Sequence, residues 1–200
     1  MRHLILVPHQ DDEMLNCYSI MKLFGNECRV AIVFKGGGEP KPNPYSPEEL
    51  YRIRNYETIE ACEKLGVKKI DFLGIPRGTQ IGLVAMDIQN YIWSIRYKEI
   101  FTCYPNDKHP EHMMLGKIIR NLGVKAVGFI TQTDYLVSMR YNTPPDISIR
   151  LSDKDYEEKV NLIDIYKTQK HFLPNIVRRL PYRIETFWRI ENDTHREIPK

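Results

Sequence analysis

The sequence of 200 residues lacks several features that mark specialised classes of protein. Its apolar runs fall well short of the roughly 18 residues of a membrane-spanning helix. The run LILV at 4–7 is too short for the core of a signal peptide, and acidic residues follow it. The sequence has only four cysteines, and no two of them form a CxxC pair. This spacing argues against a zinc ribbon or a disulfide framework and favours reduced thiols in a cytoplasmic protein.

A large excess of charge of one sign is also missing. The formal net charge is +3, well below that of a dedicated nucleic-acid-binding domain, so we do not expect a nucleic acid as the main partner. No GxGxxG or P-loop motif follows the first apolar run, which argues against binding of a dinucleotide or a nucleoside triphosphate. What is present, 42% hydrophobic and 28% charged residues, is typical of a globular domain.

Apolar segments of strand length alternate with segments of helical periodicity. Predicted strands cover 2–7, 30–34, 69–75, 100–104, 124–130 and 147–151, and predicted helices cover 12–24, 47–65, 84–97, 110–122 and 152–169. This alternation predicts an α/β fold, a Rossmann-like three-layer sandwich with a mostly parallel central sheet. We expect a single domain over 1–200 with a flexible tail at 192–200, and the rest of the segment after 169 is too mixed for an assignment.

Polar side chains cluster where two of the predicted strands end. His9, Asp11 and Asp12 follow the first strand, and His109 and His112 follow the fourth. Ligands of such sheets bind beyond the carboxyl ends of the strands, near the point where the strand order reverses. The first and fourth strands are commonly neighbours there, so we expect the two clusters to face each other.

A catalytic zinc takes three nitrogen or oxygen ligands and keeps one position open for water. His9, Asp12 and His112 can supply these ligands, which predicts one Zn²⁺ ion per chain. Asp11 is then a candidate general base, and His109 could donate a hydrogen bond or a proton to the reacting group. Two simpler interpretations stay open: the acids could only stabilise a helix N-terminus, and the histidines could be ordinary surface residues.

Two motifs carry a resemblance to a known family. PHQDDE at 8–13, paired with HPEH at 109–112, resembles the PIG-L/LmbE-like family of zinc-dependent deacetylases, which has a PHPDDE-type and an HPDH-type motif at these places. RNYETIEACEKLGV at 54–67 and KVNLIDIYKTQ at 159–169 resemble two helices of that family. The resemblance implies the same ligands and general base, a His109 that stabilises the tetrahedral intermediate, and an Arg54 that binds substrate. A salt bridge from Arg54 to Glu57 on the helix surface is the alternative.

The sequence departs from the family pattern at three positions. Gln10 replaces a proline, and Glu111 replaces the aspartate of the second motif. Arg77, within GIPRGTQ at 74–80, stands where the family often has an aspartate that helps hold the sugar. Arg77 is therefore a second candidate substrate-binding residue, and the departures bear on the substrate more than on the chemistry.

We expect a zinc-dependent hydrolase that removes an acyl group, in the first instance acetyl, from an N-acylated amino sugar or related glycoconjugate. Two alternatives remain: an amidohydrolase acting on a modified nucleotide or other anionic amide, and a non-catalytic α/β ligand-binding protein. The basic segment 167–183 would favour an anionic substrate, and the Gly- and Pro-rich loop 35–47 could shape access to the site. The sequence leaves homo-oligomerisation open.

Overall fold

A computed structural model describes residues 2–36, 44–130, 144–169 and 183–191. The strands are β1 (His3–Val7), β2 (Cys28–Phe34), β3 (Lys69–Ile75), β4 (Glu99–Cys103), β5 (Ala126–Phe129), β6 (Ile147–Arg150) and β7 (Ile184–Ile190). The helices are α1 (Asp12–Phe24), α2 (Pro47–Lys64), α3 (Ile81–Ser94), α4 (Pro110–Leu122) and α6 (Asp153–Ile163), with short 3₁₀ turns at Gly25–Glu27 and Lys167–Gln169. Most of the 35–47 loop, most of the basic segment 167–183 and the tail at 192–200 lie outside the described residues.

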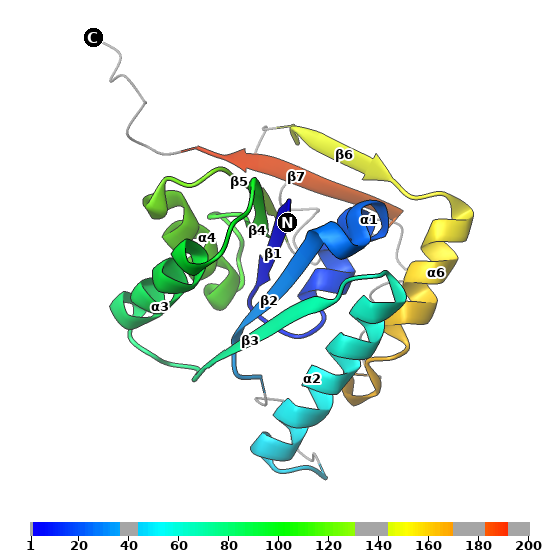
Figure 1. Ribbon diagram of the computed structural model, residues 1–200, viewed down its shortest axis with the longest axis horizontal. Coiled ribbons are helices and arrows are strands. Elements are labelled where there is room, and N and C mark those ends of the chain that lie inside the picture. Colours follow the sequence, from blue (N-terminus) through cyan, green and yellow to red (C-terminus); the bar gives the residue numbers. More distant parts are fainter. Residues whose placement is uncertain (1, 37–43, 131–143, 170–182, 192–200) are drawn as a thin grey trace.

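The strands form one sheet in the order β3-β2-β1-β4-β5-β7-β6. The pairs among β1 to β5 are parallel, and β7 runs antiparallel to both of its neighbours. Residues 4–7 of β1 are wholly buried because helices cover both faces of the sheet. Figure 1 shows α3 and α4 on one side and α1, α2 and α6 on the other, each side with its own apolar core. The predicted three-layer architecture is confirmed.

Three assignments from the sequence differ from the structure. The helix predicted at 84–97 begins and ends three residues earlier, at Ile81–Ser94. The predicted helix 152–169 ends at Ile163, and the chain then turns so that Thr168 and Gln169 donate hydrogen bonds to Glu57 and to the carbonyl of Gln10. These contacts with distant residues outweigh the local helical periodicity. The sequence analysis predicts no strand at β7, whose place in the sheet is set by its pairing with β5 and β6. Within the described ranges, each helix is too short or too polar to cross a membrane.

Candidate metal centre

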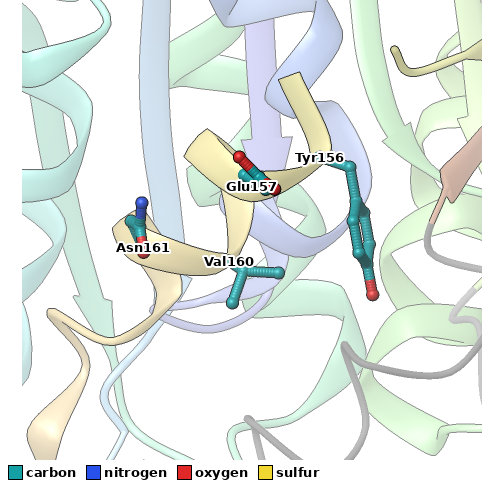
Figure 2. A pocket seen from close by; sticks show the side chains of 4 residues that line it. All are labelled: Tyr156, Glu157, Val160 and Asn161. Carbon is teal, nitrogen blue, oxygen red and sulfur yellow. The ribbon is translucent and has the colours of Figure 1, made fainter. Parts of the chain in front are cut away.

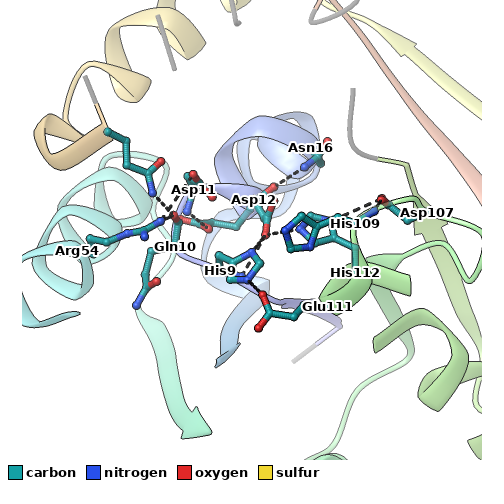
Figure 3. Close-up of polar contacts among 12 residues, drawn as sticks. His9, Gln10, Asp11, Asp12, Asn16, Arg54, Asp107, His109, Glu111 and His112 are labelled. Atoms are coloured by element: carbon teal, nitrogen blue, oxygen red, sulfur yellow. Dashed lines mark hydrogen bonds and ion pairs between the residues drawn. The ribbon is translucent and has the colours of Figure 1, made fainter. Parts of the chain in front are cut away.

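The loops that follow β1 and β4 meet at the carboxyl edge of the sheet because these strands are parallel neighbours. His9 lies just beyond β1, Asp12 begins α1, and His112 lies in the first turn of α4. Each offers a ligand atom, and the three atoms lie within 4.8 Å of one another (Figure 3). The expectation that the two clusters face each other is therefore confirmed, whereas their role as ligands stays a prediction.

One carboxylate oxygen lies at the middle of this group. Asp12 Oδ2 is 3.3 Å from His9 Nδ1 and 3.2 Å from His112 Nε2, and it accepts a hydrogen bond from the His9 backbone N–H at 3.1 Å. Asp12 and His112 are almost fully buried. Two imidazole nitrogens and one carboxylate are a donor set that catalytic zinc sites use. The chemistry of these side chains therefore fits a zinc ion.

The second ring nitrogen of each histidine faces another carboxylate. His9 Nε2 is 2.6 Å from Glu111 Oε2, and His112 Nδ1 is 3.5 Å from Asp107 Oδ2. Histidines that bind metals commonly direct their other ring N–H to a carboxylate in this way. Asp107 also accepts a hydrogen bond from the backbone N–H of His109, the residue before α4. Asp107 and Glu111 are not predicted as site residues from the sequence, although both are acids within five residues of the candidate ligand His112.

The charges in this group shift its pKa values strongly. Burial alone would lower the pKa of His112, but the charge of Asp12 outweighs it and holds this pKa well above its ordinary value. Burial would raise the pKa of Asp12, yet the two histidines hold it far below its usual range. The His109 side chain remains accessible to solvent on one side. The part of the ring that is buried, together with the neighbouring imidazoles, lowers its pKa. The group without a metal is therefore an ion pair, with His109 favouring its neutral form.

Asp11 connects β1 to α1 with a rare backbone conformation. Its φ is 122°, and it is the one non-glycine residue with a positive φ in the part of the chain that the structure describes. The backbone N–H of Asp11 donates to Glu13 Oε2 at 3.0 Å, and Tyr166 donates its hydroxyl to the other oxygen of Glu13. Burial and the charge of Asp12 raise the pKa of Asp11 well above its ordinary value. This turn places the Asp11 carboxylate next to a candidate ligand.

Arg54, on α2, contacts the same turn through Gln10 and Asp11. It is 5% exposed, donates a hydrogen bond to the carbonyl of Gln10 at 2.9 Å, and has Nη2 3.8 Å from Asp11 Oδ2. The alternative of a salt bridge on the helix surface is therefore wrong, and Glu57 instead accepts two hydrogen bonds from Thr168. Gln10, which replaces the proline, is wholly buried and donates to Asn55.

Arg77 reaches the site from the loop after β3. Its Nε lies 3.0 Å from Glu111 Oε1, and its Nη2 lies 2.8 Å from Glu111 Oε2. The structure thus brings all the candidate residues to one edge of the sheet. Arg54 is buried against the Asp11 turn, whereas Arg77 lies at the surface of the site, with 43% of its side chain exposed.

A separate hollow lies on α6. It is lined by Tyr156, Glu157, Val160 and Asn161, which all come from this one helix (Figure 2). None of these residues belongs to the candidate centre. Among the residues that the structure describes, the hollow is lined by a single carboxylate, that of Glu157, and so we assign it no catalytic or metal-binding role.

Comparisons with known proteins found a matching family model and a similar curated protein. The family model described as "GlcNAc-PI de-N-acetylase" (PIG-L) matches residues 4–123. The chain is 28% identical, over 131 residues, to the Bacillus cereus protein named "Probable N-acetyl-alpha-D-glucosaminyl L-malate deacetylase 2". That match covers 59% of this chain and 59% of the relative, so the chain aligns with less than two thirds of the relative's length.

Two solved structures share the fold. N,N'-diacetylchitobiose deacetylase from Pyrococcus horikoshii has a TM-score of 0.77 at 18% identity, over 94% of this chain and 83% of that one. GalB, the 4-carboxy-2-hydroxymuconate hydratase from Pseudomonas putida KT2440, has a TM-score of 0.73 at 13% identity, over 100% of both chains. At these identities the likeness shows the fold alone.

Proposed function

Because the chain belongs to the PIG-L (GlcNAc-PI de-N-acetylase) family, we propose that it is a zinc-dependent deacetylase acting on an N-acetylated amino sugar or related glycoconjugate. The observation that carries the proposal is the convergence of His9, Asp12 and His112 at the carboxyl ends of β1 and β4, with Asp11 beside them. The names of the Bacillus and Pyrococcus proteins, both deacetylases of N-acetylated sugars, support this class of substrate.

We assign the roles within the site as follows. His9, Asp12 and His112 would hold one zinc ion, which when bound supplies an activated water and polarises the substrate carbonyl. Asp11 acts as the general base, because its raised pKa makes its carboxylate a better proton acceptor than an exposed aspartate. The protonated Asp11 then returns the proton to the leaving amine.

His109 and the two arginines complete the proposal. The lowered pKa of His109 favours the neutral imidazole, whose ring N–H donates a hydrogen bond to the oxyanion of the tetrahedral intermediate. Arg54 is buried against the Gln10 carbonyl, and we propose that it holds the Asp11 turn in place. Direct binding of substrate by Arg54 or by the exposed Arg77 stays a prediction from the sequence.

The test is release of acetate from N-acetylglucosamine, its malate conjugate, diacetylchitobiose and N-acetylated sugar phosphates, each with and without a chelator. We expect chelator-sensitive release from at least one of them. The variant Asp12→Ala should lose metal and activity together, whereas Asp11→Asn should keep the metal and lose about 10²- to 10⁴-fold in rate. Asp87→Asn, on the exposed face of α3, is the control and should behave as the unaltered protein.

Absence of chelator-sensitive acetate release from every compound would contradict the proposed function. A fully active Asp11→Asn variant would contradict the assignment of the base alone.

A further inference from the structure

We propose that Arg77 and Glu111 act as a positioning pair for His9 and thereby set how tightly the centre binds zinc. The proposal rests on the metal-dependent function proposed above. It assigns to Arg77 a role through Glu111, in place of the substrate binding that the sequence suggested.

The pair is built from three connections of the fold. His9 follows β1, Arg77 follows β3, and Glu111 lies in the first turn of α4. Glu111 Oε2 is 2.6 Å from His9 Nε2, and the Arg77 guanidinium meets both oxygens of Glu111, at 3.0 Å from Nε and 2.8 Å from Nη2. The three side chains therefore form a continuous chain of charge-assisted hydrogen bonds that ends at a candidate ligand.

This chain of contacts has a chemical consequence at His9. A carboxylate that accepts the proton of Nε2 leaves the lone pair of Nδ1 unprotonated when the ring is neutral. Nδ1 is the nitrogen that faces Asp12, at 3.3 Å from Oδ2, and so points toward the other candidate ligands. Glu111 therefore selects the tautomer of His9 that presents Nδ1 for metal binding.

Arg77 holds the Glu111 carboxylate in the orientation in which it accepts the hydrogen bond from His9. The fork of a guanidinium fixes the plane of the carboxylate that it binds, which a point charge cannot do. Arg77 and Glu111 both stand at positions where the PIG-L/LmbE-like family often has an aspartate, and in this structure the two side chains contact each other.

The experiment measures the affinity for zinc alone, by competition with a chromophoric chelator, in Glu111→Gln, Arg77→Gln and the double variant. We expect Glu111→Gln to weaken zinc binding about 10- to 100-fold, the usual loss when the carboxylate partner of a ligand histidine is removed. Arg77→Gln should weaken it by a smaller factor, and Arg77→Lys should keep part of the affinity. The double variant should bind zinc as Glu111→Gln does, because Arg77 acts only through Glu111.

The control is Arg2→Gln, which removes another arginine from an ion pair, 2.8 Å from Glu27 at the opposite edge of the sheet. It should leave zinc affinity unchanged. Thermal melts of the metal-free variants establish that each is folded before zinc is added.

Three results would overturn the proposal. Zinc affinity could be unchanged in Glu111→Gln, or Arg77→Gln could weaken zinc equally with and without Glu111. Arg77→Gln could also raise KM while leaving zinc affinity intact, which would restore the substrate-binding role. In each case the unaltered protein still binds zinc, so the proposed function survives; failure of the unaltered protein to bind zinc would remove both proposals.

Discussion

Replacing Asp11 with glycine should give a protein that is inactive yet more stable than the Asp11→Ala variant. Asp11 has φ 122° and ψ −32°, a conformation in which a Cβ atom is disfavoured and glycine is not. The surrounding contacts hold it there: its N–H donates to Glu13, and its carbonyl accepts hydrogen bonds from Met14 and Leu15. Both substitutions remove the carboxylate, so the comparison isolates the backbone.

The expected difference follows from two opposing effects. A residue held in such a backbone conformation costs about 1–3 kcal/mol. Glycine relieves that cost but loses about 0.5–1 kcal/mol more conformational free energy on folding than alanine does. We therefore expect the glycine variant to be more stable by up to about 2.5 kcal/mol. Each kcal/mol moves the melting temperature by about 2–4 °C in a chain of this size.

The assay is thermal and urea unfolding of the chelator-treated variants, with acetate release measured in parallel. The same pair of substitutions at Asn90, on the exposed face of α3, is the control, because glycine in an ordinary helix is about 1 kcal/mol less favourable than alanine. Asp11→Gly could instead be less stable than Asp11→Ala by as much as Asn90→Gly is less stable than Asn90→Ala. In that case the backbone of Asp11 would not be strained.

Three further predictions concern charged groups. Burial would lower the pKa of His9, but its bonds to Asp12 and Glu111 outweigh burial and raise this pKa, and the charge of Asp12 likewise raises the pKa of His112. Zinc binding near pH 6.5 should therefore release more than about one proton. Calorimetry in buffers of different ionisation enthalpy measures this release. In the metal-free protein, the raised pKa values of His9 and His112 contribute stability that is fully present below pH 6.5 and is lost as the pH rises through these pKa values. A melting temperature that rises with pH above 6.5 would contradict the two pKa shifts. Lys159→Met should cost about 3–5 kcal/mol in urea unfolding, because Lys159 and Glu185 are fully buried 2.6 Å apart. The variant leaves the buried Glu185 carboxylate without this cation, although Ser19 still donates hydrogen bonds to it. Adding Glu185→Gln should recover part of that loss, and simple additivity of the two changes would exclude the coupling.

Most of the parallel part of the fold could be predicted because four of its strands, β1, β2, β4 and β5, are buried on both faces. Such strands read as apolar runs, and the helices between them have their own start and stop signals, as at α2, where Ser46 and Glu49 form a capping box. The antiparallel strand β7 gives no such local signal, and its place between β5 and β6 depends on pairing across the chain. The predicted end of α6 is wrong, because Thr168 contacts Glu57 on α2 and Gln169 contacts the Gln10 carbonyl, and these contacts outweigh the helical period.

The candidate site could be predicted as residue types at strand ends, but not as a network. His9, Asp12 and His112 stand out in the sequence because each motif is local and the sheet topology joins the two. The bond from His9 to Glu111 spans 102 residues, and that from Arg77 to Glu111 spans 34, so no local pattern reveals either. The burial of Arg54 likewise depends on how α2 packs against the Gln10 turn.

The fold itself does not choose the reaction. A protein named as a hydratase shares this fold over the whole chain, so the chemistry must lie in the side chains at the carboxyl edge. Adding water to a double bond requires a proton at carbon, whereas hydrolysing an amide requires a proton at the leaving nitrogen. Under the function that we propose, the buried carboxylate of Asp11, beside the candidate ligand Asp12, would take a proton from water and return it to the leaving amine.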